Sequence, residues 1–177
     1  IKDYSQEALR KSIGLVLQEP FLYHGTIASN IRMYHEELTD EEIRQAAAFV
    51  DVADFIESLP GGYDHPVTER GSTLSTGQRQ LLAFARTIAA QPKILILDEA
   101  TANIDQETEE MIQNSLKKMR QGRTTIAIAH RLSTIQDADC IYVLDKGKII
   151  ESGNHDQLIA LGGTYKKMYD LQAGMMK

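Results

Sequence analysis

Two adjacent acids, Asp98 and Glu99, follow a short apolar run and could support metal-dependent chemistry. The run is Ile94–Leu97, and the whole stretch reads ILILDE. Magnesium prefers oxygen ligands, so Asp98 is predicted to hold that ion directly or through water. Glu99 could orient and deprotonate a water molecule that attacks phosphorus. The pair therefore predicts hydrolysis of a nucleotide.

Polar side chains also end two other apolar runs: Gln18 closes IGLVLQ and His130 closes TTIAIAH. Ligands of open α/β sheets bind outside the carboxyl ends of the strands, so three strands would place these groups at one edge. Gln18 offers a neutral oxygen to the metal, and His130 can donate to a terminal phosphate oxygen. Each residue alone is more often a loop, surface or structural residue. Their occurrence at equivalent strand ends favours a catalytic site.

The stretch LSTGQ, Leu74–Gln78, precedes a helical pattern. Ser75 and Gln78 fit the capping box S-x-x-Q, and Gly77 is expected to leave the backbone accessible. Free N–H groups and the positive end of the helix dipole would favour an anion there. The alternative is an ordinary helix cap. We expect two arginines of this helix, Arg79 and Arg86, to be solvated or paired.

Apolar runs that alternate with helical patterns predict an α/β fold. Continuous runs rich in Ile and Val are typical of strands buried on both faces of a parallel sheet. The predicted strands are Ile13–Gln18, Ile94–Glu99 and Thr124–His130, with a hairpin of CIYVLD and GKIIES around Asp145–Gly147. The predicted helices are Gln106–Arg120, with an apolar stripe at Met111, Ile112, Leu116 and Met119, then Asp156–Leu161 and Thr164–Ala173.

A helical insertion is predicted between the first and second strands. Its helices are Ile27–Tyr34, Asp40–Val50 and Val52–Ser58, and PGGYDHP reads as a loop. Thr39 or Asp40 is expected to cap the second of these helices. This interpretation assigns residues 1–19 and 91–177 to a sheet-containing core and residues 20–90 to a helical subdomain.

Composition excludes several functions. The net charge of −6 and the pI of about 5.4 argue against a protein that binds nucleic acid mainly through its phosphates. A single cysteine, Cys140, is expected to be a buried thiol and rules out a disulfide framework. No apolar run reaches the ~18–20 residues needed to span a bilayer, and the first residues lack a signal-peptide pattern. Any membrane role would come through a partner or through sequence not present here.

A phosphate-binding loop of the form G-x-x-x-x-G-K-[ST] is missing from the sequence. The only Gly-Lys pair is Gly147-Lys148; Tyr142 stands five residues before that glycine, and Ile149 follows the lysine. The acid pair therefore has no conventional phosphate cradle within these 177 residues.

Five stretches together strongly resemble the nucleotide-binding domain of ABC transporters. VLQEPFLYHGTI, LSTGQ, ILILDEA, TANID and IAH occur in the family's order, and the likeness covers essentially the whole chain. TERGSTLSTGQRQ and FLYHGTIASNI are most similar to bacterial multidrug and lipid exporters, in which transmembrane and ATPase domains share one polypeptide. The resemblance implies a RecA-like P-loop NTPase core with an inserted helical subdomain, and hydrolysis of ATP with Mg²⁺.

The resemblance also implies roles for individual residues. Gln18 corresponds to the Q-loop glutamine, which contacts metal and water and senses the transmembrane domain. Asp98 resembles the Walker B aspartate and Glu99 the catalytic glutamate. Asp105 resembles the D-loop aspartate, and His130 the switch histidine, both near the bound nucleotide.

Ser75, Thr76, Gly77 and Gln78 resemble the signature motif, which contacts the nucleotide held by a second ATPase domain packed head to tail. Thr76 replaces the glycine that is commoner in the family. Thr68–Gly71, TERG, resembles the exporter loop that touches the coupling helices of the transmembrane domain. These likenesses imply a protein at the cytoplasmic face of the cell membrane, with no nucleic-acid partner.

In this family a stacking aromatic, the phosphate loop and its helix precede the segment that Ile1–Tyr4 resembles. The chain therefore resembles an ABC ATPase domain without roughly its N-terminal third, and alone it is expected to be inactive. The family's missing strand would lie next to TTIAIAH, so unpaired edges and exposed apolar surface are expected. Two alternatives are a non-transport ABC ATPase, acting for example on ribosomes or DNA, and a non-catalytic interaction module that lost its phosphate loop.

Overall fold

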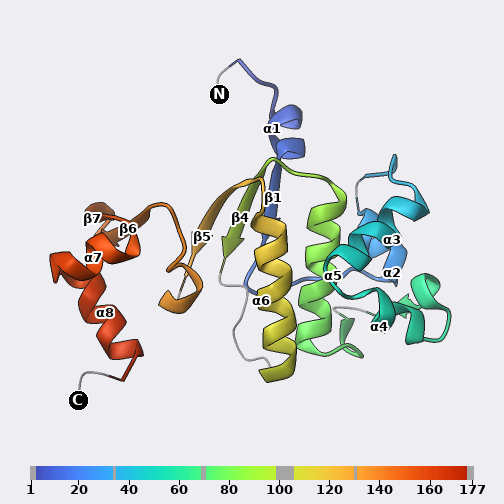
Figure 1. Cartoon of the computed structure of the whole chain (residues 1–177). Coiled ribbons are helices and arrows are strands. Elements are labelled where there is room, and N and C mark those ends of the chain that lie inside the picture. Colours follow the sequence, from blue (N-terminus) through green and yellow to red (C-terminus); the bar gives the residue numbers. More distant parts are fainter. Residues whose placement is uncertain (1–2, 34, 69–70, 99–105, 130, 175–177) are drawn as a thin grey trace. The chain divides into compact units, whose positions relative to one another are not determined.

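The computed structural model describes residues 3–33, 35–68, 71–98, 106–129 and 131–174 (Figure 1). The chain forms two compact units, Ile1–Ile128 and Ala129–Lys177, which are described separately below. The expected division into a core and a helical subdomain, with boundaries at residues 19–20 and 90–91, falls inside the first unit and stays a prediction. No helix of the described parts is long and apolar enough to cross a membrane.

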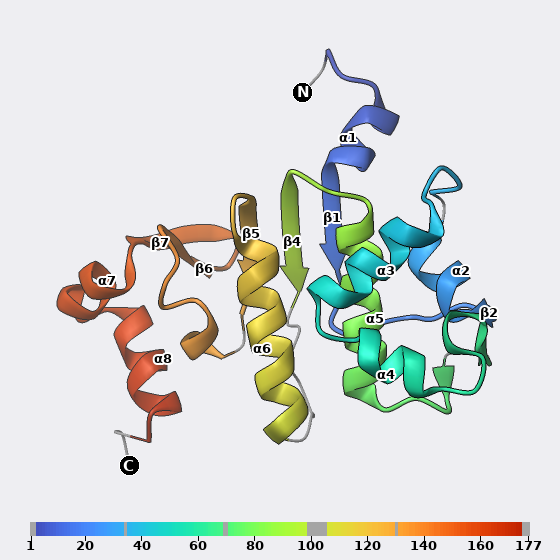
Figure 2. The same cartoon turned by 45° about the vertical axis from the view of Figure 1, so that its right-hand side comes forward.

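A parallel sheet forms the first unit's centre. Its strands are β1 (Ile13–Val16), β4 (Ile94–Asp98) and β5 (Thr124–Ile128), in the order β1-β4-β5. Val16 lies opposite Leu97, and Asp98 lies opposite Ile128. Figure 2 shows the three strands side by side. The three predicted strands are confirmed, although β1 and β5 end two residues before the predicted ends, Gln18 and His130. Because all three strands are parallel, their carboxyl ends share one edge.

Only one face of this sheet is buried, although burial of both faces was predicted. Val16, Leu95 and Leu97 are buried in the main core, whereas Ile126 and Ile128 are 56% and 54% exposed. Residues in register on parallel strands point to the same side, so the exposed isoleucines share their face with other apolar side chains of β1. These are the exposed Ile13 and Leu15.

Helix α5 (Thr76–Ala89) packs against β1 on the covered face. The approach is close, since a Cβ built on Gly14 would lie 2.6 Å from Thr87 Cγ2. The same helix packs against α2 (Ile27–Arg32), α3 (Asp40–Phe49) and α6 (Gln106–Arg120). Helix α5 therefore packs against both the sheet and the helices of the insertion.

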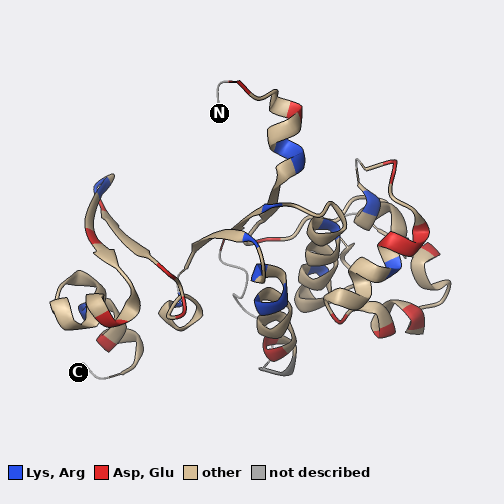
Figure 3. Cartoon of the chain, turned by 45° about the horizontal axis from the view of Figure 1, so that its top comes forward, with Lys and Arg blue, Asp and Glu red and all other residues tan. Residues whose placement is uncertain are grey.

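The helical insertion follows the prediction closely. It contains α2, α3, α4 (Ala53–Ser58) and a 3₁₀ turn at Gly62–Asp64, and the short strands β2 (Gly25–Thr26) and β3 (Pro66–Val67) pair antiparallel. The sequence did not predict this two-residue ladder or α1 (Gln6–Ser12), which Ser5 caps. Acidic residues lie in the first turns of α3 and α4, where they complement the helix dipoles. Figure 3 shows the acidic and basic residues along the chain.

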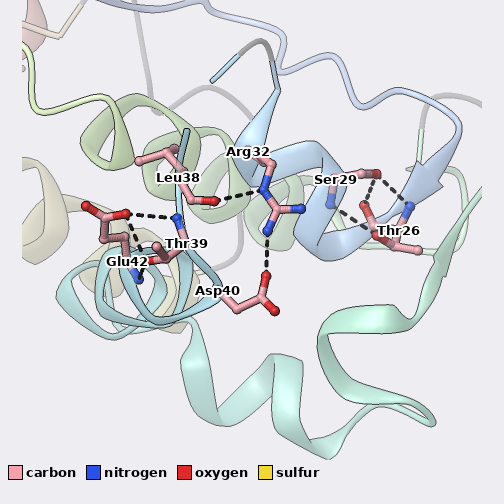
Figure 4. A network of polar contacts seen from close by, with 7 residues as sticks. All are labelled: Thr26, Ser29, Arg32, Leu38, Thr39, Asp40 and Glu42. Carbon is pink, nitrogen blue, oxygen red and sulfur yellow. Dashed lines mark hydrogen bonds and ion pairs between the residues drawn. The ribbon is translucent and has the colours of Figure 1, made fainter. Parts of the chain in front are cut away.

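Local polar contacts fix α2 and α3 (Figure 4). Thr39 caps α3 in a capping box with Glu42, which decides the choice between Thr39 and Asp40. Arg32 joins the two helices, because its Nε donates to the Leu38 carbonyl oxygen at 3.1 Å and its Nη2 pairs with Asp40.

Helix α6 spans the predicted residues, and Ile112, Leu116 and Met119 are buried. Met111 is exposed, so the prediction that it shares their stripe is wrong. One residue along a helix turns the side chain by about 100°, which moves Met111 off the face that Ile112 occupies. Ser115 donates from Oγ to the Val50 carbonyl oxygen at 2.9 Å and ties α6 to the helical insertion.

The second unit contains the predicted hairpin, β6 (Ile141–Asp145) and β7 (Lys148–Gly153), followed by α7 (His155–Leu161) and α8 (Thr164–Gln172). Its core comprises Leu132, Ile141, Val143, Leu158 and Tyr165. Cys140 is exposed, so its predicted burial is wrong. Because side chains alternate along a strand, Ile141 and Val143 face the core while Cys140 and Tyr142 face outward.

Candidate functional site

Both predicted metal ligands lie at the carboxyl edge of the sheet. Asp98 is the last residue of β4 and is half-buried, and Gln18 is exposed two residues beyond the end of β1. Glu99, Asp105 and His130 lie outside the described residues. The structure thus brings Gln18 and Asp98 to one edge, and the roles of all five residues stay predictions.

The oxygen atoms at this edge fit a hard cation. A carboxylate and a carboxamide are the oxygen donors that Mg²⁺ takes in proteins, and nucleotide sites add ligands from the phosphates. The described side chains do not form a complete metal site by themselves, because they include no group of three or more His, Cys, Asp or Glu that could hold an ion.

The start of α5 forms the predicted capping box. Ser75 Oγ accepts from the Gln78 N–H at 3.1 Å, and Gln78 Oε1 accepts from the Ser75 N–H at 2.9 Å. The dipole of this 14-residue helix places partial positive charge here. The cap occupies the Gln78 N–H, so an anion would rely on the N–H groups just before it.

Gly77 is buried, which contradicts the expectation that it leaves the backbone accessible. Gly77, Leu81 and Phe84 follow the spacing of a helix stripe, and that stripe faces the core. Ser75 and Thr76 are the exposed residues at the helix start.

Arg79 stabilises the start of α5. From the sequence we expected only that this arginine would be solvated or paired. Its Nη1 donates to the Leu74 carbonyl oxygen, and its Nη2 donates to Thr76 Oγ1 at 3.1 Å. The hydroxyl of Thr76 therefore makes a contact that the family's commoner glycine could not make.

The loop after β1 is held against the helical insertion. Leu22 is fully buried, while the flanking Phe21 and Tyr23 are each 45% exposed. Their rings contact edge to face, with centroids 4.9 Å apart. The sequence predicted a partner contact only for the Gln18 region of this loop. The alternation of aromatic, leucine and aromatic at residues 21–23 is the signal that could have indicated the exposed pair.

Gly71 connects this loop to the start of α5. Its φ is +63°, and a Cβ at this position would lie 2.9 Å from Leu22 Cδ1 and 3.3 Å from Arg79 Cδ. Of the TERG segment, Thr68 and Gly71 are described. Gly71 of the TERG segment and Leu22 of the loop after β1 therefore lie together beside the signature-like helix.

Comparison with known proteins agrees with this geometry. The profile of a family described as "ABC transporter" matches residues 1–102. A bacterial Atm1-family ABC exporter solved with ATP bound is 43% identical and superposes with a TM-score of 0.88 over 98% of this chain and 30% of that one. The fold is thus that of P-loop NTPases with an inserted helical region. The chain belongs to the ABC transporter family.

Named relatives are similar over nearly the whole chain. An ABC transporter ATP-binding protein of Streptococcus pneumoniae is 77% identical over 99% of this chain and 30% of its own length. An ATP-dependent lipid A-core flippase of Shewanella sp. (strain MR-4) is 49% identical over 98% of this chain and 29% of its own length. The chain thus spans about 30% of the length of these relatives.

Proposed function

We propose that this chain is part of the ATP-binding and ATP-hydrolysing domain of an ABC exporter that moves drugs or lipids across a membrane. The observation that carries the proposal is the shared carboxyl edge of β1 and β4, where Gln18 and Asp98 lie. The names of similar proteins support the direction of transport and the cargo class, since they include an exporter, a lipid flippase and a multidrug resistance transporter.

In this proposal each polar group at the edge has a separate task. Mg²⁺ bound with ATP would neutralise phosphate charge, and Asp98 and Gln18 would hold it. Glu99 would accept a proton from the attacking water, and His130 would donate to the terminal phosphate. Asp105 would lie near the nucleotide at the domain interface.

The start of α5 would act in trans. Ser75, Thr76, Gly77 and Gln78 would face the nucleotide held by a second ATPase domain, packed head to tail with the first. The dipole and the exposed Ser75 and Thr76 suit contact with a terminal phosphate.

The transmembrane partner would dock at the Gln18 region and at Thr68–Gly71. This places the chain at the cytoplasmic face of the membrane, within an integral membrane protein. The packing of Gly71 against Leu22 supports one continuous docking region rather than two separate ones.

The test is Glu99→Gln in the whole exporter. This change keeps the shape of the side chain but removes its basicity, so turnover of ATP should fall by a factor of at least ~10² while ATP binding persists. Glu110→Gln, at an exposed position of α6, removes a carboxylate that is not among the predicted site residues and should leave turnover unchanged. Near-normal steady-state hydrolysis by the Glu99 variant would exclude it as the base.

A further inference from the structure

Arg86, in the last turn of α5, binds a segment that is remote in sequence. Its Nε donates to the Asn30 carbonyl oxygen at 2.7 Å, its Nη1 to the Phe21 carbonyl oxygen at 2.9 Å and its Nη2 to Asn30 Oδ1 at 3.1 Å. One planar guanidinium group therefore holds both the loop after β1 and helix α2.

Asn30 completes the connection from the other side. It is 2% exposed, and its Oδ1 accepts from the Tyr23 N–H at 2.8 Å. Its Nδ2 donates to the carbonyl oxygens of Tyr23, at 2.8 Å, and Thr26, at 3.0 Å. The backbone from Phe21 to Tyr23 is thus fixed at three points by two side chains.

The fixed backbone presents a rigid aromatic pair. Phe21 and Tyr23 lie partly exposed on either side of buried Leu22, and the Arg86 guanidinium lies 5.8 Å from the centroid of the Tyr23 ring. Rigid, exposed aromatic side chains lose little conformational entropy when a partner binds, which favours them as anchors of an interface.

We propose that Arg86 is a positioning residue that fastens the Phe21–Tyr23 pair to α5, so that a load applied to the pair moves the start of α5. The inference rests on the proposed function, in which a transmembrane partner docks on this loop and the start of α5 contacts ATP. Arg86 touches neither nucleotide nor partner in this scheme and acts only through the loop.

The route through α5 is short and stiff. Arg86 and Thr76 belong to one helix and are ten residues apart, or about 15 Å at 1.5 Å per residue. Gly77, Leu81 and Phe84 are buried along the same helix, so its two ends are held in one packed body. Motion at the loop would therefore reach the nucleotide-facing end without an intermediate segment.

The informative variant is Arg86→Lys, which keeps the positive charge but cannot place three donors in a planar fork. The matched control is Arg123→Lys. Arg123 also donates three hydrogen bonds, in its case to the backbone carbonyl oxygens of Pro92, Met119 and Gln121, and it lies three residues beyond the end of α6. Both variants lose a guanidinium group that donates three hydrogen bonds, but only Arg86→Lys loses the link to the aromatic pair.

The experiment measures amide hydrogen exchange in the whole exporter with and without Mg·ATP and vanadate. In the wild type, exchange should slow both at the start of α5 and in residues 21–24. In Arg86→Lys the start of α5 should still respond, but the response of residues 21–24 should shrink by a factor of at least ~5, the lower end of typical coupling between sites. Arg123→Lys should respond as the wild type does.

Two results would overturn the inference: a full loop response in Arg86→Lys, or an equal loss in Arg123→Lys. If Arg86→Lys fails to fold, Asn30→Asp weakens the attachment of the loop instead: it keeps the acceptor for Arg86 but removes the two bonds that Nδ2 donates, one of them to the Tyr23 carbonyl oxygen, so the response of residues 21–24 should again shrink. A wild type whose α5 start ignores ATP would instead overturn the proposed function, which keeps the two failures apart.

Discussion

Helix α5 and strand β5 belong to the same compact unit, yet they differ in how completely this chain surrounds them. Ten of the fourteen residues of α5 are buried, whereas β5 has no buried residue. Both segments are apolar, so hydrophobicity does not explain the difference. Helix α5 packs against α2, α3, α6 and β1, while in the described structure β5 pairs only with β4.

The comparison separates two parts of the proposed machine. The start of α5 is stabilised from within this chain, by Arg79. The loop after β1 is likewise held by residues of this chain, Arg86 and Asn30. The sheet edge offers Gln18 and Asp98, but the sequence holds no phosphate loop to go with them. Three predictions test this contrast, from the largest expected effect to the smallest, and a fourth tests a helix cap in the insertion.

The strand-end edge alone should bind ATP poorly. Without a phosphate loop, several charge-assisted hydrogen bonds of ~1.5–3 kcal/mol each are missing, so affinity should be at least ~10³-fold below that of the whole domain. Calorimetry with Mg·ATP on the purified chain, at roughly 100 µM protein, is suited to weak binding. A micromolar dissociation constant, or phosphate release that depends on Glu99, would contradict this.

Shortening a side chain to alanine should lower the free energy of unfolding strongly in α5 and hardly at all in β5. Phe84 is fully buried, so Phe84→Ala should lower the free energy of unfolding by about 3–5 kcal/mol. Ile126→Ala, at a site more than half exposed, should change it by no more than about 0.5 kcal/mol. Chemical denaturation of both variants compares them directly, and equal losses would mean that β5 is covered after all.

The open sheet face should promote self-association of the isolated chain. Exposed apolar side chains on a strand with an unpaired edge favour pairing with another copy. Ile126→Lys should therefore shift sedimentation towards the monomer. Leu144→Lys is the control, because Leu144 is also exposed but lies on β6 in the second unit. If both changes act alike, exposed apolar area in general is responsible rather than β5.

Acid should loosen the helical insertion through Glu42. Its carboxylate accepts from the Thr39 backbone N–H and hydroxyl, and these bonds, the backbone one first, lower its pKa below 4.5. A depressed pKa in the folded state means that the stabilisation is present above pH 4.5 and is lost as the pH falls below it.

The measurement for Glu42 is a pH series of thermal unfolding followed by circular dichroism. Glu42→Gln should flatten the acid slope slightly, while Glu41→Gln, one residue earlier on the same exposed turn, should not. Identical slopes in both variants and the wild type would remove Glu42 as a source of acid sensitivity.

Local interactions explain what the sequence determined by itself. The capping box of α5, the hairpin turn with Lys146 and Gly147 at positive φ, and the apolar runs of the three strands depend on residues close in the chain or on hydrophobic period. At α3 the sequence offered Thr39 or Asp40, and the structure decided for Thr39. The motifs that resemble the ABC family are likewise contiguous, so the order of residues along the chain is enough to indicate the family. The roles of Gln18, Asp98, Glu99, Asp105, His130 and the signature-like residues remain predictions of that kind.

Tertiary structure decided which side of each element is covered and which remote residues meet. Burial of Gly77 and exposure of Cys140 and Met111 depend on how each helix or strand is rotated against its neighbours, and hydrophobic type alone does not specify this. Arg86 lies 65 residues from Phe21 and 56 from Asn30, so no local pattern could pair them. Such contacts exist because packing brings α5 against the insertion, and the free energy that selects them comes from burying both surfaces at once.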